Sequence, residues 1–504
     1  MQQSIPEILN SLNQFLPEIS LIATLLVCLI LDIILRKKSL VVSVIALIGL
    51  AVTLYFSILE TGLNKAIFSN MMAVDPYALF FKYIFIISSA LIIIFFDISS
   101  EIKSATHHNE YTLLVLSLAL GGFLMASAIN MLMMYLSLEL ASLTSYIIAG
   151  YNKKIKRSSE AALKYVIYGA ASSGIMLYGM SLLYGYTGSM NIYRISQYLA
   201  QPSALSSNPL LVVVLVMIAA GMGYKISSVP FHFWTPDVYE GSPTPVTAFL
   251  AVTSSAAGFS LIARFFLITF MTSPNLIDGN IFPVISSIPW KTLLIILSVA
   301  SMIVGNFVAV WQTSMKRILA YSSIAQAGYI MVGIIAGSKL GVTAMMIYIG
   351  AYLIMNLGAF LCTLMIVNKI GSDDIDDMKG LAYRSPAVCV AMALFMLALA
   401  GIPATVGFIG KFYLISSLLE VGSGYIWLAV VLLLNSVVSL FFYFKVIKKM
   451  YLDKPEVEDL PKIKYSYGYY ILLLVLAVPT VVLGLFFQPL LKIAEASSIF
   501  FGIK

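Results

Sequence analysis

Several ionisable side chains lie inside long apolar stretches of this sequence, where a charge is costly. Glu139 and Lys411 lie near the middle of their stretches, and Lys225 lies at the end of the apolar part of another, before a proline break. An ionised group at the centre of a membrane helix costs roughly 2.5–3.5 kcal/mol on insertion scales, so such groups are usually functional. A carboxylate and two ammonium groups can each bind and release a proton. These residues therefore predict proton transfer through an apolar layer.

The local sequence around both lysines predicts interrupted helices. Lys225 precedes VPFHFWTPD, which contains two prolines, and Lys411 follows GIPATVGFIG. Proline removes a backbone donor and disfavours a helix before it, and interrupted membrane helices expose backbone at an ion site. The alternatives stay open: Lys225 could extend its stem to the inner interface, and Glu139 could be a protonated glutamate bonded to a neighbouring helix.

The remaining charges in or near the apolar stretches have weaker functional signals. Lys164 lies about one turn inside its stretch, so interface and functional interpretations are equally supported. Lys82 and Arg264 lie close enough to the ends of their stretches that we expect them to reach the outer interface. Glu18 is expected to be interfacial for the same reason.

A polar loop, PFHFWTPDVYEGSPTP, follows Lys225 and contains His232, Asp237 and Glu240. Its spacing sets no metal-ligand geometry, so a metal site has weak support. Trp234 and Tyr239 are expected to be membrane-interface anchors. The three cysteines lie in separate apolar stretches, which argues against a disulfide or zinc site. Without a nucleotide-binding or nucleophile–base motif, we expect no cofactor in this chain.

The amino-acid composition indicates that the chain lies mainly in lipid and not in water. Of 504 residues, 60% are apolar and only 11% are charged, whereas soluble domains have about 25% charged residues. Such a chain cannot cover a water-exposed surface, so lipid must be its main environment. The formal charge of +7 comes mostly from cations in short loops between apolar stretches. This is the positive-inside pattern and gives no support for nucleic-acid binding.

Apolar stretches long enough to span a membrane predict an all-α polytopic protein of about fourteen helices. They lie near 17–35, 39–59, 77–96, 111–128, 130–150, 160–186, 209–228, 244–271, 291–313, 318–337, 340–368, 386–419, 424–447 and 467–489. The cation-rich loops alternate with cation-poor loops, which predicts an N-terminus outside. The first apolar stretch is expected to be a membrane helix and not a cleaved signal.

Helices 4–8 and 9–13 form two sets of five, and the fourth helix of each set is the interrupted one with a lysine. Because five is odd, the second set must run opposite to the first, as in inverted repeats. We therefore expect an N-terminal three-helix segment (1–110), a first repeat (111–271), an inverted second repeat (291–451) and a C-terminal loop with the last helix (452–504).

Five segments resemble one known family. These are SLELASLTSYIIAGY, SSEAALKYVIYGAASSG, YKISSVPFHFWTPDVYEGSPTPV, MKRILAYSSIAQAGY and LALAGIPATVGFIGKFYL. They resemble the antiporter-like, proton-translocating subunits of respiratory complex I, or NADH-quinone oxidoreductase. Among these subunits, the chain resembles subunit N (subunit 2) most. Three features support this: the DVYEGSPTP motif, the lysine at 411 and the end of the chain after helix 14.

The resemblance implies roles for individual residues. Glu139 and Lys225 would form the inner half-channel pair, Lys411 would serve the outer half, and Lys164 matches a further family lysine. Two positions depart from the family pattern, because Ser255 stands where many members have a relay lysine and Gln326 where many have a histidine. We expect water bridged by Ser255, Ser254 and Gln326 to replace that relay, with His232 as a further candidate.

The resemblance also implies partners and a location. Iron–sulfur clusters, flavin and quinone would be bound by partner subunits of a complex I-type enzyme. The partners would be two more antiporter-like subunits, small membrane subunits and a peripheral electron-transfer arm. A bacterial plasma membrane is expected, with a thylakoid-type membrane as the alternative. Two other functions stay open: a subunit of a multisubunit cation/proton antiporter or membrane-bound hydrogenase, and a passive scaffold.

Overall fold

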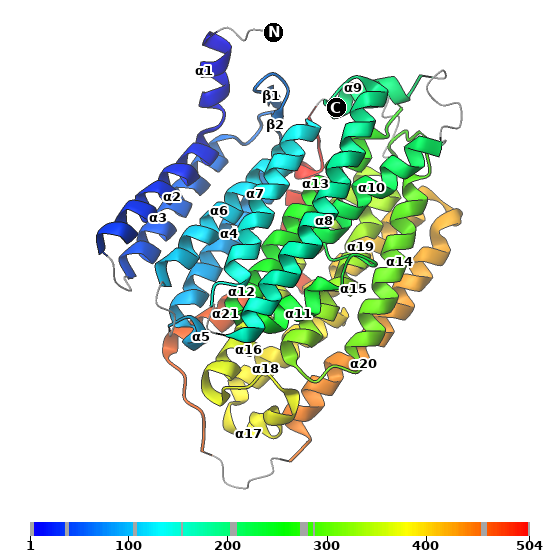
Figure 1. Ribbon diagram of the computed structural model, residues 1–504. Helices are drawn as coiled ribbons and strands as arrows, with labels where there is room; N and C mark the ends of the chain where they lie inside the picture. The colour runs from blue at the N-terminus through cyan, green and yellow to red at the C-terminus, as the bar shows by residue number, and fades with distance from the viewer. Residues whose placement is uncertain are drawn as a thin grey trace.

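The computed structural model is a bundle of helices with a small two-stranded sheet at one end (Figure 1). It describes residues 5–35, 40–103, 108–152, 155–201, 209–272, 281–285, 288–454 and 461–501. Within these ranges, twelve helices are long and apolar enough to cross a membrane. The expected all-α polytopic membrane protein is confirmed. The expected inner-loop cations Arg36, Lys37, Lys38, Lys153 and Lys154 lie outside the described residues.

The described part of the N-terminal segment contains five helices and the hairpin β1–β2. Its elements are α1 (Ile5–Asn13), α2 (Leu16–Leu35), α3 (Leu40–Leu59), β1 (Lys65–Ile67), β2 (Met72–Val74), α4 (Pro76–Ile98) and α5 (Ser100–Lys103). The two strands pair antiparallel, with Ala66 opposite Ala73. Asp75 caps α4 by accepting a hydrogen bond from the Ala78 amide at 2.8 Å, so the helix begins directly after the hairpin.

The first expected repeat contains the interrupted segment that follows Lys225. Its elements are α6 (His108–Ser127), α7 (Met131–Ala149), α8 (Lys156–Thr187), α9 (Ile192–Leu199), α10 (Pro209–Lys225), α11 (Trp234–Gly241), α12 (Thr244–Phe249), the π-helix η2 (Leu250–Ser254) and α13 (Ser255–Thr269). Helix α9 lies across the end of the bundle that carries both termini (Figure 1).

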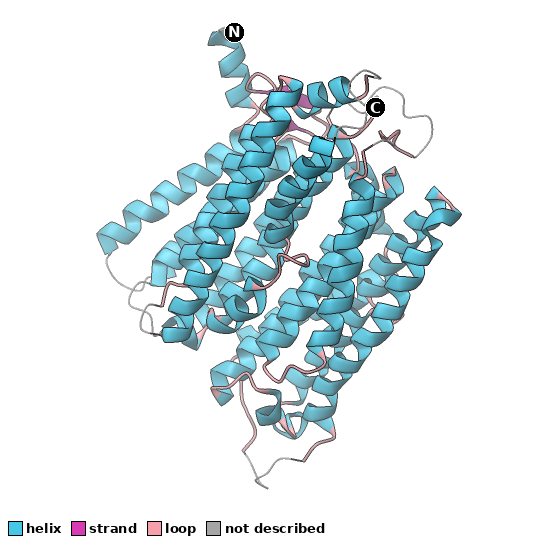
Figure 2. Ribbon diagram, turned by 45° about the vertical axis from the view of Figure 1, so that its right-hand side comes forward, coloured by secondary structure: helices cyan, strands magenta, loops and turns pink. Residues whose placement is uncertain are grey.

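The second expected repeat and the C-terminal segment complete the bundle. Their elements are α14 (Trp290–Ala309), α15 (Met315–Ala336), α16 (Lys339–Ile370), η3 (Ile375–Met378), α17 (Leu381–Arg384), α18 (Pro386–Ala400), α19 (Val406–Val421), η4 (Ser423–Tyr425), α20 (Ile426–Tyr451), α21 (Tyr467–Leu485) and α22 (Gln488–Ser497). Figure 2 shows the long helices running side by side along the bundle.

Burial separates central helices from peripheral ones. The most apolar windows of α15, α16 and the α12–α13 segment are 94% buried, whereas those of α2 and α21 are 22% buried. The peripheral helices expose large apolar side chains, such as Leu434 and Phe441 on α20. An exposed apolar belt of this extent fits contact with lipid and makes α15 and α16 the core of the bundle.

The predicted spans agree closely with the observed helices. Besides the twelve long helices, the described residues contain two shorter apolar helices, Leu210–Lys225 and Pro386–Ala400. Both belong to spans that the sequence predicts to be interrupted. Both chain ends lie at the same end of the bundle (Figure 1), so the chain crosses it an even number of times. The count of fourteen stays a prediction that this arrangement supports.

Helix lengths support the two expected repeats. The first helix of each set, α6 and α14, has 20 residues, and the third, α8 and α16, has 32 residues. The fourth helix of each set is interrupted, as α10–α11 and as α18–α19. The repeat boundaries at 111–271 and 291–451 stay a prediction.

Several expectations about charged and aromatic side chains were wrong. Lys82, Arg264 and Glu18 are all almost completely buried and do not extend outward from the bundle. Arg264 forms a bidentate ion pair with Asp75 at 2.7 and 2.8 Å, and Lys82 binds Glu18 at 2.8 Å. Each partner lies on another element, which hydropathy along one helix cannot show.

Trp234 and Tyr239 are also buried, at 2% and 1% exposure, and so are not interface anchors. Trp234 stacks on Tyr165 with ring centroids 4.2 Å apart, and its indole donates to the Tyr224 carbonyl at 3.2 Å. Both aromatic residues pack inside the bundle because α11 folds back beside α8 after the interruption.

Candidate functional site

Lys411 lies at the interruption between α18 and α19. Gly401 ends α18 in the left-handed conformation, with φ of 89°, and Pro403 follows two residues later. The Lys411 ammonium donates to the Ala400 carbonyl at 2.8 Å and to the Leu399 carbonyl at 3.3 Å. The last carbonyls of a helix have no partner within it and carry partial negative charge. The interruption therefore provides the ligands that hold a buried ammonium.

Close packing keeps Lys411 in this position. Its side chain is only 5% exposed, and its ammonium lies 4.6 Å from the centre of the Tyr329 ring, where a cation–π contact is favourable. A Cβ on Gly401 would lie 2.9 Å from Lys411 Cδ. Glycine is therefore required at 401 both for the backbone conformation and for the lysine stem.

Lys225 occupies a corresponding place at the first interruption. It is the last residue of α10 and is 3% exposed. Its ammonium donates to Ser142 Oγ on α7 at 3.3 Å. Gly258 on α13 faces its stem, because a Cβ there would lie 3.2 Å from Lys225 Cγ. Lys225 thus has one weak hydroxyl partner, whereas Lys411 has two carbonyl partners.

Glu139 lies one turn before Ser142 on α7, so both side chains face the same side of the helix. The carboxylate acts electrostatically on Lys225, although no direct ion pair joins these two described residues. Its Oε1 atom is buried and accepts no hydrogen bond from the described residues. Because Lys225 donates to Ser142, Glu139 and Lys225 both lie on the same side of α7. The predicted inner pair is therefore close, but no ion pair joins its two members among the described residues.

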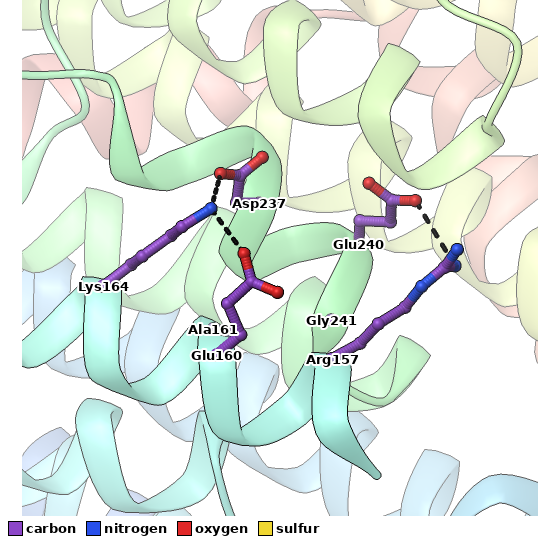
Figure 3. Close-up of a pocket in the computed structure, with 7 residues that line it drawn as sticks. All are labelled: Arg157, Glu160, Ala161, Lys164, Asp237, Glu240 and Gly241. Carbon is purple, nitrogen blue, oxygen red and sulfur yellow. Dashed lines mark hydrogen bonds and ion pairs between the residues drawn. The ribbon is translucent and has the colours of Figure 1, made fainter.

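Lys164 lies apart from Lys225 and Lys411, in a charged pocket beside α11 (Figure 3). The pocket has a volume of about 210 Å³ and is lined by Arg157, Glu160, Ala161, Lys164, Asp237, Glu240 and Gly241. Lys164 is 37% exposed and binds Asp237 at 2.6 Å and Glu160 at 2.7 Å. It is therefore a surface residue of the isolated chain, and α11, which carries its partner Asp237, lies in the half of the bundle away from both termini (Figure 1).

Asp237 joins this pocket to α15. Arg317 donates to Asp237 at 3.0 Å and to Glu240 at 2.9 Å. Burial raises the pKa of Asp237, but hydrogen bonds and charge from Lys164 and Arg317 outweigh it, so the pKa lies below the usual value. Asp237 therefore remains ionised and links the two expected repeats near neutral pH.

The two serines of the expected relay lie at an irregular point of their helix. Residues Leu250–Ser254 form a π-helical turn, and Ser255 begins α13 directly after it. Ser254 is buried, and Ser255 is partly buried with its hydroxyl 3.5 Å from the Leu250 carbonyl. Ser255 lies one turn before Gly258, on the face that packs against Lys225. π-Helical turns occur frequently at functional sites.

Gln326 connects to Lys411 through a shared acceptor. Its amide nitrogen donates to the Leu399 carbonyl at 3.3 Å, and this carbonyl also accepts from Lys411. The Tyr348 hydroxyl donates to Gln326 Oε1, and the Gln326 amide donates to the Tyr443 hydroxyl at 3.4 Å. Gln326 is therefore part of the Lys411 site.

His232 is buried near the other interruption, and its Nδ1 has no hydrogen-bond partner among the described residues.

The sequence interpretation missed a set of buried tyrosines inside the bundle. They are Tyr146, Tyr165, Tyr224, Tyr239, Tyr329, Tyr348, Tyr352 and Tyr443. Tyr348 and Tyr352 are four residues apart on α16 and face Gln326 and Ser323 on α15, but the sequence alone does not show these partners. Their hydroxyls would otherwise be unsatisfied in an apolar core.

Within the part of the chain that the structure describes, no group of three or more His, Cys, Asp or Glu side chains is placed to hold a metal ion. The chemistry that this site offers is proton binding and release by carboxyl and amine groups, with hydroxyl groups as hydrogen-bond partners.

Comparisons with known proteins agree on one family. Residues 128–438 match the model of the NADH:quinone oxidoreductase/Mrp antiporter transmembrane family. This chain belongs to that family. It is 44% identical to NADH-quinone oxidoreductase subunit N 2 of Chloroherpeton thalassium, over 99% of this chain and 96% of the relative. The expected resemblance to subunit N is confirmed.

Solved structures support the same assignment. A chain of respiratory complex I from Thermus thermophilus superposes with a TM-score of 0.77 at 28% identity, covering 95% of this chain and 99% of that one. A chain of the Mrp complex from Dietzia sp. superposes with a TM-score of 0.80 at 20% identity, covering 97% of both chains. The latter likeness concerns the fold alone.

Proposed function

We propose that this chain is the antiporter-like, proton-translocating membrane subunit of a complex I-type NAD(P)H or ferredoxin:quinone oxidoreductase, of the subunit N kind. The observation that carries the proposal is the burial of Lys225 and Lys411, each at the interruption of a membrane helix. Family membership over nearly the full chain supports the assignment to such an enzyme. Quinone reduction elsewhere in the complex would drive proton movement here.

Protons enter near Lys164, in the half of the bundle away from both termini, and pass to Glu139 and Lys225. They leave from Lys411 on the opposite side. The N-terminus is outside, and the membrane is a bacterial plasma membrane, with a thylakoid-type membrane as the alternative. Coupling acts through electrostatics: when Glu139 moves or is neutralised, the buried Lys225 loses its anion and releases its proton.

Hydroxyl groups complete the path where Ser255 and Gln326 replace ionisable residues. Ser254 Oγ is buried and has no hydrogen-bond partner among the described residues, so it is free to bind water. Tyr352 donates to Ser323 Oγ at 2.7 Å, one turn before Gln326. A hydroxyl both donates and accepts a hydrogen bond, so such groups can order a chain of water molecules without holding charge. This arrangement supports the relay through Ser254, Ser255 and Gln326.

The partners are other membrane subunits, including two more antiporter-like subunits and small membrane subunits, together with a peripheral electron-transfer arm and lipid. Iron–sulfur clusters, flavin and quinone belong to those partners, and this chain holds no cofactor. The large exposed apolar side chains of the peripheral helices supply surface for both lipid and neighbouring subunits.

Substitution of each lysine tests the translocation role in the assembled complex. Lys225→Met and Lys411→Met keep an unbranched side chain one atom shorter and remove its charge, and Lys339→Met is the control because Lys339 is exposed. The complexes are reconstituted in liposomes, and quinone reduction and proton uptake are followed together. We expect both buried variants to lose most proton pumping and the control to retain it. Full pumping by both would favour the scaffold function.

The second candidate, a subunit of a cation/proton antiporter or membrane-bound hydrogenase, is favoured by the fold shared with the Mrp chain. Purification in mild detergent, with identification of every co-purifying chain, separates the two. Recovery of iron–sulfur and quinone-site subunits with two related antiporter-like chains supports the complex I-type pump. Recovery of antiporter partners alone would contradict it.

A further inference from the structure

A cluster of three ionisable side chains lies in the N-terminal segment, outside the path through Glu139, Lys225 and Lys411. It consists of Glu18 on α2, Glu60 directly after α3 and Lys82 on α4. Lys82 Nζ lies 2.8 Å from Glu18 Oε1 and 2.8 Å from Glu60 Oε2. The exposed fractions are 1%, 7% and 1%. Glu18 is in the first turn of α2 and Glu60 precedes β1, and α1 and β1 lie at the end of the bundle that carries both termini (Figure 1).

The charges of this cluster do not balance. Two ionised carboxylates and one ammonium would leave a net charge of −1 in a nearly dry site. Within the described residues, Glu18 and Lys82 are the charged groups that act on Glu60. The other carboxylates of these helices, Asp32 on α2 and Asp97 on α4, lie about 20 Å further along. A buried charge without compensation costs several kcal/mol, so a cation must balance it.

Hydrogen bonding identifies a proton as that cation. Each carboxyl group uses one oxygen to bind Lys82, and the other oxygens, Glu18 Oε2 and Glu60 Oε1, are buried without a partner. An ionised carboxylate with a bare buried oxygen loses its hydration without replacement, whereas a protonated carboxyl carries no charge there. Two carboxyls in one site commonly share a single proton in this way.

We propose that Glu18, Glu60 and Lys82 form a second protonatable site, which binds one exchangeable proton shared between the two carboxyl groups. This inference does not depend on the proposed function. Glu60 is the more exposed carboxyl and follows the last residue of α3, so the proton enters and leaves from the end of the bundle near β1. Lys82 stays charged and holds the remaining carboxylate.

Infrared spectroscopy of the purified intact complex tests this site. Its carboxylic-acid C=O stretch, which shifts in D₂O, is recorded as the pH is varied. We expect Glu60→Gln and Glu18→Gln each to remove one titrating carboxyl, because each variant leaves a balanced carboxylate–ammonium pair. Glu495→Gln is the control, since Glu495 is exposed, and should leave the signal unchanged.

A third variant changes the number of bound protons in the opposite direction. Lys82→Met removes the ammonium, so both carboxyls should be protonated and the acid signal should rise from one group to two. Unchanged spectra in both glutamine variants would show that the carboxyls are ionised and would overturn the proposal. A band that appears only when Na⁺ is replaced by a larger cation would also overturn it, because a metal ion would then balance the charge.

Discussion

Gly401→Ala is expected to displace Lys411 from its carbonyl partners without changing any ionisable residue. Gly401 has φ of 89°, where an L side chain costs about 1–2 kcal/mol. The new Cβ would also lie 2.9 Å from Lys411 Cδ, so the lysine stem must move. The 2.8 Å bond from its ammonium to the Ala400 carbonyl is then lost or lengthened.

The size of the effect follows from that bond. A hydrogen bond to a charged group contributes about 1.5–3 kcal/mol. Its loss lowers the population of the Lys411 ammonium at the Ala400 carbonyl roughly 10- to 150-fold relative to other positions of the side chain. If Lys411 must bind the Ala400 carbonyl in every cycle, proton pumping by Gly401→Ala should fall by at least tenfold per quinone reduced.

Gly371→Ala is the matched control. Gly371 also ends a long helix in the left-handed conformation, with φ of 81°, but a Cβ there would meet no other atom. Both variants therefore suffer the same backbone strain, and only Gly401→Ala moves the lysine. The assay compares proton uptake with quinone reduction in reconstituted complexes at matched assembly. Equal pumping by the two variants would refute the reasoning.

Three further predictions concern stability and the relay. Gln326→Leu leaves the buried Tyr348 hydroxyl without its acceptor and removes one hydrogen bond each from the Leu399 carbonyl and the Tyr443 hydroxyl, so proton pumping should fall severalfold in the same liposome assay. Arg264→Leu breaks a fully buried ion pair and should lower the unfolding free energy by about 3–5 kcal/mol, which is measured as a lower thermal inactivation temperature. The control, Arg194→Leu, changes an exposed position and should leave that temperature almost unchanged. Asp237→Asn should lower stability by less than about 1 kcal/mol, because its ion pairs are partly exposed. Since the pKa of Asp237 lies below its usual value, this difference should persist from pH 8 to pH 5 and shrink only below about pH 4.

The sequence was sufficient to locate the two lysines that the proposed function needs. A charge within an apolar stretch and a proline or glycine beside it are both local signals, so Lys225 and Lys411 were visible without a structure. The interruptions were predicted for the same reason. By contrast, Lys82 was misassigned, because Glu18 and Glu60 lie on other elements and only packing brings them within 2.8 Å of its ammonium.

The buried tyrosines show another limit of sequence patterns. Within an apolar helix, a tyrosine such as Tyr348 resembles phenylalanine in hydropathy, and its hydroxyl becomes informative only when its partner is known. That partner is Gln326, on a helix that precedes it in the chain. From the sequence, position 326 could only be expected to bind water in place of an ionisable relay residue, whereas the structure surrounds the position with tyrosine hydroxyl groups.

The two lysines are held differently, and this difference assigns them different parts in a proton cycle. Lys411 is fixed by backbone carbonyls at a helix end, which cannot be neutralised and can change only if the interruption itself moves. Lys225 has a single serine hydroxyl and a nearby carboxylate, Glu139, whose charge can change by protonation. Proton release from Lys225 can therefore follow a chemical event at Glu139, whereas release from Lys411 requires a conformational change. In a pump these would be separate steps, so a proton that leaves Lys225 could be retained at the outer half until the α18–α19 interruption opens.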